Sequence, residues 1–142
     1  MTTIDALIER LRGLTGLDVE ADRLLLAIFE PDHPGMRRYS DGYKTEWRDG
    51  AFSVWSDNYS HSAPYPRFTA SVDAALALTD RVLPGWSISL HGSLSEGCVD
   101  LHDGTVPYSK GRRADSGSAS RPWPIAILLA TLTALQQTKD QS

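Results

Sequence analysis

The chain has 142 residues, with 14 Lys plus Arg against 18 Asp plus Glu and a formal net charge of −4. This acidic balance argues against a dedicated binder of duplex nucleic acid, because such proteins gain most of their affinity from excess basic charge. The single cysteine, Cys98, excludes an internal disulfide and a multi-cysteine zinc site. No apolar run approaches the roughly 18 residues of a membrane-spanning helix. We therefore expect one cytoplasmic domain over residues 1–142, without a membrane partner.

Four segments carry apolar residues at helical spacing. Asp18 and Ser71 each precede one of them, and their side-chain oxygens can cap the exposed N–H groups of a first helical turn. The spacing predicts helices over residues 4–14, 19–29, 72–83 and 121–137.

Two segment pairs are typical of β-hairpins. The pair 43–48 and 51–56 flanks Asp49-Gly50, a tight-turn signal that sets Trp47 opposite Phe52. The second pair, 86–91 and 97–102, sets His91 opposite Cys98 and Ser87 opposite His102.

Alternation in the second hairpin separates an apolar face from a polar face. The side chains predicted to face the core are Trp86, Ile88, Leu90, Val99 and Leu101. Those predicted on the opposite face are Ser87, Ser89, His91, Cys98, Asp100 and His102.

Residues 57–69 contain two prolines, Pro64 and Pro66, and residues 103–120 are rich in Gly, Ser, Arg and Lys, which predicts two loops. The resulting order of elements is ααββαββα. It predicts an α+β fold in which an antiparallel sheet is packed with helices, similar to an α/β/α sandwich.

Residues 68–78, FTASVDAALAL, and 83–86, LPGW, resemble the hallmark of the phage ABA sandwich domain family, a group of small phage and prophage proteins. The predicted helices at the two ends of the chain are similar to that family's terminal helices. The resemblance implies a sheet between helices, a phage or prophage origin and an accessory role in the infected host, with no settled reaction or cofactor. The same residues also have a structural explanation, since Ser71 caps a helix and Pro84-Gly85 ends it.

The polar face of the second hairpin gathers His91, Cys98, Asp100 and His102, all of which are metal-ligand types. The register sets the two histidines at opposite ends of the strand pair, which disfavours a tetrahedral site. Cys98 lies in mid-strand, whereas reactive thiols favour helix N-termini or electropositive pockets. We predict no catalytic residue, metal or cofactor here and interpret the face as a half-solvated surface.

Aromatic and cationic side chains concentrate in the two predicted loops and at the start of the last helix. Guanidinium groups pair with phosphate oxygens and rings stack on bases, so these residues are candidates for binding a nucleotide. The alternative is a pair of solvated loops whose charges keep the protein soluble. The candidates are Tyr59, His61, Tyr65, Arg67, Tyr108, Lys110, Arg112, Arg113 and Trp123.

Two functions are compatible with the sequence. The first is non-enzymatic capture of a small anionic ligand, such as a nucleotide signal of host defence, in the setting that the family resemblance implies. The second is an interaction module that docks a host or phage protein, with Trp55 and Trp123 as anchors. We also expect a homodimer, because symmetric pairs dominate soluble oligomers.

Overall fold

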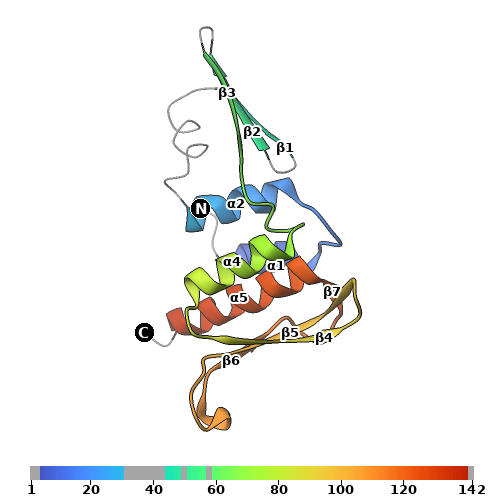
Figure 1. Ribbon diagram of the computed structural model, residues 1–142, viewed down its shortest axis with the longest axis vertical. Coiled ribbons are helices and arrows are strands. Elements are labelled where there is room, and N and C mark those ends of the chain that lie inside the picture. The colour runs from blue at the N-terminus through green and yellow to red at the C-terminus, as the bar shows by residue number, and fades with distance from the viewer. Residues whose placement is uncertain (1–3, 31–43, 49–50, 57–58, 141–142) are drawn as a thin grey trace.

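The computed structural model describes residues 4–30, 44–48, 51–56 and 59–140. Its helices separate two antiparallel sheets (Figure 1). The α+β class is therefore confirmed, but the layer order differs from a sheet enclosed by helices. The helices are α1 (Ile4–Arg12), α2 (Val19–Phe29), α4 (Val72–Val82) and α5 (Trp123–Asp140).

Two predicted caps begin α2 and α4. The Asp18 carboxylate accepts a hydrogen bond from the backbone N–H of Glu20 at 3.1 Å, and the Ser71 hydroxyl accepts one from that of Ala74 at 3.1 Å. Each side chain satisfies a donor that the first helical turn leaves unpaired.

The first sheet consists of β1 (Lys44–Arg48), β2 (Ala51–Ser56) and β3 (Tyr59–Pro64), in that order. Its first hairpin has the predicted register, with Trp47 opposite Phe52, whereas Tyr43 and the predicted turn at residues 49–50 lie outside the described residues.

Strand β3 corrects the prediction of a loop over residues 57–69. It pairs along β2, and the hydroxyls of Ser53 and Ser62 lie 2.9 Å apart across that pair. The sequence concealed the strand because β3 lacks the alternation of apolar and polar residues that marks one.

The second sheet has the order β4 (Ser87–Gly92), β5 (Glu96–His102) and β6 (Arg113–Asp115), and β7 (Arg121–Pro122) also pairs with β5. His91 lies opposite Cys98 and Ser87 opposite His102, as predicted. The predicted loop over residues 103–120 contains β6 and a short 3-10 helix, η1 (Tyr108–Lys110).

Helix α5 is the centre of the core. It packs against α1 and α4 on one side and against β5 and β6 on the other. Val99 and Leu101 of β5 are 0% and 1% exposed beneath it, but Ile88 and Leu90 of β4 are 38% and 50% exposed. The prediction that these two β4 side chains join the core is wrong, because the helix covers β5 and leaves the neighbouring strand largely open.

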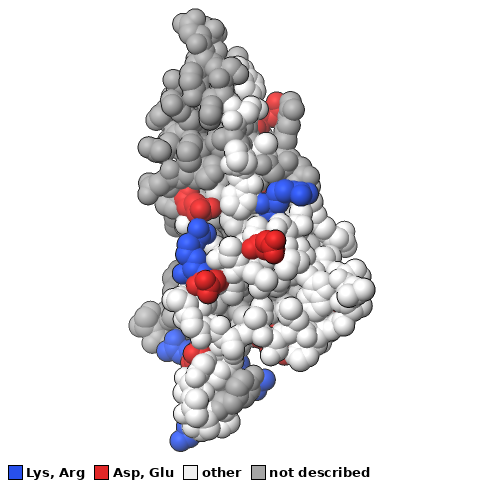
Figure 2. All heavy atoms as spheres, in the orientation of Figure 1, with Lys and Arg blue, Asp and Glu red and all other residues white. Residues whose placement is uncertain are grey.

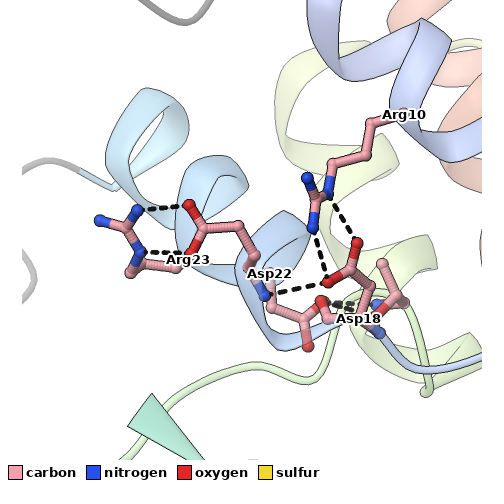
Figure 3. Close-up of polar contacts among 6 residues, drawn as sticks. Arg10, Asp18, Asp22 and Arg23 are labelled. Carbon is pink, nitrogen blue, oxygen red and sulfur yellow. Dashed lines mark hydrogen bonds and ion pairs between the residues drawn. The ribbon is translucent and has the colours of Figure 1, made fainter. Parts of the chain in front are cut away.

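A polar network attaches the segment after β3 to the helices (Figure 3). Arg10 donates two hydrogen bonds to the Asp18 carboxylate, at 2.6 and 3.2 Å, and this contact lowers the pKa of Asp18. The Thr69 hydroxyl accepts from the Asp18 backbone N–H at 2.9 Å and donates to the buried Asp22 carboxylate at 2.8 Å. The network therefore joins α1, α2 and the start of the α4 segment.

Candidate anion-binding site

The sequence-predicted ligand residues occupy two ends of the molecule. Tyr59 and His61 belong to β3, whereas Tyr108 and Lys110 belong to η1, and the helical layer lies between these elements (Figure 1). The two clusters therefore do not form one composite site. The side chains of Tyr59, His61 and Tyr108 lie outside what the structure describes.

In the first cluster, Tyr65 is part of the core. It is 5% exposed, and its ring meets that of Trp47 edge-on, with the centroids 5.2 Å apart. Arg67, two residues later, is exposed. Packing accounts for Tyr65 without a ligand.

The second cluster is organised by Asp103. Its carboxylate accepts hydrogen bonds from the backbone N–H groups of Arg112 and Thr105, each at 2.9 Å. These bonds lower the pKa of Asp103 to about 2, because they stabilise the charged form. The bond to Arg112 joins the two ends of the segment that carries Lys110, and the side chains of Lys110 and Arg112 are exposed.

Trp123 secures the β4–β5 hairpin to α5. Its indole N–H donates to the backbone carbonyl of Ser93 at 3.0 Å, and its ring lies where a side chain at Gly97 would stand. This packing leaves the ring poorly placed to stack on a ligand.

A series of hollows runs beside α5 on the β6 and β7 side of the second sheet. The first, of about 230 Å³, shares Arg12, Ala119 and Arg121 with a second hollow of about 290 Å³. It shares Asp115 and Thr133 with a third, of about 430 Å³, which Arg113 also lines. We call these adjoining hollows the arginine groove. It brings together arginines from α1, β6 and β7.

Residues 116–120, SGSAS, form one wall of the groove. The Ser116 hydroxyl accepts from the Val99 backbone N–H at 2.9 Å, which attaches the loop to β5. Gly117 has a φ of 94°, a conformation that glycine adopts at little cost, and its N–H donates to the Asp115 carboxylate at 2.8 Å. Arg121 Nη1 donates to the carbonyls of Ser116 and Ala119, at 3.0 and 3.3 Å. The loop is thus held at several points.

The two shared arginines retain donors for a ligand. Within the described residues, Arg121 and Arg12 make side-chain hydrogen bonds only through Nη1, which for Arg12 contacts Glu9 at 2.5 Å. A guanidinium has five N–H donors in a planar fork. Asp115, Asp100 and Glu96 also line the groove, so its positive charge is local to the arginines.

The polar face of the second sheet shows a pair and no larger cluster. His91 Nε2 lies 3.1 Å from Asp100 Oδ2, while Cys98 Sγ is 3.7 Å from the carbonyls of Ser118 and Ala119. Among the described residues, no group of three or more His, Cys, Asp or Glu is placed to hold a metal ion.

The candidates named from the sequence include Lys110, Arg112 and Arg113 but neither of the two shared groove arginines, Arg12 and Arg121. Arg12 ends an amphipathic helix, where a basic residue is common because it complements the helix dipole. Only the packing of α1 on α5 brings Arg12 to the groove. No local sequence signal could have found it.

Comparison with known proteins adds no constraint on this site. No family model, no curated protein and no solved structure matches the chain. No described helix has the length and apolar character needed to cross a membrane.

Proposed function

We propose that the protein binds a small phosphate-bearing ligand in the arginine groove and captures it without converting it. The observation that carries this proposal is the meeting of Arg12 and Arg121, from opposite ends of the chain, on two adjoining hollows. Side chains so distant in sequence converge only through the tertiary fold. A guanidinium binds phosphate oxygens through two parallel hydrogen bonds, which gives both affinity and orientation.

The dimensions of the groove favour a small ligand. The central hollow, of about 230 Å³, is smaller than most pockets for drug-sized molecules, which start near ~300 Å³. A phosphate group fits there, against a wall of small residues and an α5 surface formed by Leu129 and Thr133. The third hollow, beside Arg113, gives a base or a second phosphate room to extend.

Capture alone is a useful activity in the setting that the sequence resemblance implies. An accessory protein of a phage that sequesters a nucleotide signal of host defence needs affinity and no turnover. This role is the one we assign to the groove.

Thermal unfolding with added ligands tests the proposal. The probes are pyrophosphate and a panel of linear and cyclic nucleotides. A ligand present at about 100 times its dissociation constant stabilises the folded state by about 2.7 kcal/mol, so a bound nucleotide raises Tm measurably. Unchanged Tm at millimolar concentrations of every probe would contradict the proposal.

A matched pair of variants locates the site. Arg12→Gln removes a groove guanidinium, and we expect at least about a ten-fold loss of affinity, the scale of a lost charge-assisted hydrogen bond. Arg112→Gln removes an exposed guanidinium that is not among the residues lining the groove, and it should leave affinity unchanged. Isothermal titration calorimetry measures both. If the two variants lost equal affinity, the ligand would be attracted by the general positive charge of the arginines and would not be bound at a defined site.

Docking of a host or phage protein is the second candidate, supported by Trp55. Its side chain is 36% exposed on β2, and exposed tryptophans are frequent anchors of interfaces. Trp55→Ser should abolish capture of a partner from infected cells. Capture that is unchanged by this substitution would exclude Trp55 as the anchor.

A further inference from the structure

Strand β4 is an open edge of the second sheet. It pairs with β5 on one side, and no described strand pairs with its other side. An open edge presents backbone N–H and C=O groups that can pair with another chain, so natural proteins protect edges with charges, prolines or bulges.

The other edge strands carry such protection, and β4 does not. Strand β1 contains Lys44, Glu46 and Arg48, β3 ends in Pro64, and β6 contains two charged residues in its three positions. The sequence of β4, SISLHG, has neither proline nor any Lys, Arg, Asp or Glu.

The side of β4 toward the helices is also incompletely covered. Ile88 and Leu90 are the half-exposed apolar side chains described above, and they extend the buried row formed by Val99 and Leu101. On the face that Figure 2 shows, the flank that carries the β4–β5 hairpin is drawn mostly white. The edge and the apolar side chains thus form one uncharged surface.

Strand β4 is complementary to itself. In an antiparallel pair of two β4 strands centred on Ser89, Ile88 of each copy lies opposite Leu90 of the other, and Ser87 lies opposite His91. Directly opposed residues share a face of a sheet, so apolar side chains meet apolar ones and polar side chains meet polar ones. The same register sets Trp86 of one copy opposite Gly92 of the other, so that the indole ring can pack over the glycine.

We propose that two copies of this chain form a homodimer by antiparallel pairing of their β4 strands about a two-fold axis at Ser89. The two second sheets become one continuous sheet, and both helical layers lie on the same face of it. The Ile88 and Leu90 side chains of the two copies then pack against one another between the layers.

The net charge of the chain is compatible with a second copy as the partner of the β4 edge. Each chain has a formal net charge of −4, so copies approach most readily through an uncharged surface, which β4 supplies. A single strand pair with few flanking side chains falls at the small end of specific interfaces, below about 1,200 Å² in total, so we expect a dissociation constant in the micromolar range. The arginine groove lies on the opposite side of β5, so dimerisation leaves it open.

Sedimentation equilibrium of the full chain from micromolar to millimolar concentration tests the dimer. The wild-type protein should shift from monomer to dimer across this range. Ser89→Glu brings two carboxylates together at the axis, beside Asp100 on the neighbouring strand, and should weaken the dimer by at least about five-fold. Ser109→Glu, the same change on the exposed η1, should leave the equilibrium unchanged.

Mixing two variants tests the register. Ser89→Lys alone should also dimerise more weakly than the wild type, and an equimolar mixture with Ser89→Glu should form a heterodimer at least as readily as the wild type pairs with itself. Opposite charges meet only if Ser89 faces Ser89 of the partner. Circular dichroism confirms that each variant is folded.

Two results would overturn the proposal. If the wild-type protein is monomeric at every concentration, the homodimer does not form, and β4 would pair with a strand of a different protein instead. A dimer whose equilibrium is the same for Ser89→Glu as for the wild type forms through another surface.

Discussion

The two sheets of this protein each contain three consecutive antiparallel strands, β1-β2-β3 and β4-β5-β6, but they differ in how much of each sheet the helices cover. Helix α5 packs along β5 and β6 of the second sheet, and the side chains between them are almost fully buried. The first sheet contacts the helices chiefly through β1 and α2, within the described residues. Trp47 of β1 also meets the ring of Tyr65, which follows β3, edge-on. Similar strand pairing therefore coexists with very different burial.

This difference indicates where stability and function reside. Burial of apolar area is the main source of stability, so the second sheet and α5 should form the most stable part of the molecule. The arginine groove is built on this part, which keeps its arginines in fixed positions before a ligand arrives.

The largest expected effect comes from a cavity beneath α5. Leu101→Ala removes a side chain that is 1% exposed and should lower the free energy of unfolding by about 2–5 kcal/mol. Trp55→Ala, in the first sheet, should lower it by less than about 1 kcal/mol, because that side chain is partly in water. Urea unfolding measures both. Equal losses would show that the two sheets are equally supported.

The next largest effect concerns the polar network through which Thr69, in the segment after β3, is attached to the helices. Thr69→Val removes the hydroxyl that joins Asp18 and Asp22, and it leaves a buried carboxylate with one donor fewer. We expect a loss of about 1–3 kcal/mol in the free energy of unfolding. The control is Thr133→Val: among the residues that the structure describes, its hydroxyl bonds only to a carbonyl of its own helix, so it should contribute less than about 1 kcal/mol. A loss for Thr133→Val as large as that for Thr69→Val would show that the Thr69 hydroxyl adds no more stability than an ordinary helix hydroxyl.

Acid should lower the stability of the folded protein through protonation of Asp103, which follows β5 of the second sheet. Its pKa in the folded protein is about 2, below the 3.8 of an unperturbed aspartate, so the charged form contributes stability above pH about 4. That contribution is lost as pH falls through about 2. Asp103→Asn should therefore flatten the dependence of Tm on pH between these values. Parallel curves for Asp103→Asn and the wild type would contradict the prediction.

The smallest effect concerns the ion pair between α2 and α4. Arg81 Nη1 lies 3.1 Å from Glu30 Oε1, and both side chains are partly exposed. Arg81→Gln should lower the free energy of unfolding by no more than about 1 kcal/mol, and less in high salt, because water and ions screen exposed pairs. Thermal unfolding at two salt concentrations checks this. A large loss that persists in salt would reveal a role beyond the pair.

The sequence was sufficient for elements defined by local chemistry. Helical spacing and the caps Asp18 and Ser71 predicted α2 and α4 closely. The turn signal between β1 and β2 and the alternation in β4 and β5 predicted both hairpin registers. In each case the information lies within a few neighbouring residues.

Features that depend on distant partners could not be predicted in this way. Strand β3 forms because β2 offers a partner for its backbone, although its own sequence is polar. Ile88 and Leu90 have an apolar pattern, but their exposure depends on where α5 lies. Arg12 joins Arg121 only after α1 has packed on α5.

The central position of α5 has a consequence for biosynthesis. This helix follows every other described element in the chain, yet it supplies the apolar surface that covers α1, α4 and β5. During translation those elements emerge from the ribosome before their common partner exists. The nascent chain must therefore expose their apolar faces until α5 has been synthesised, and chaperones have their main opportunity to bind during that interval.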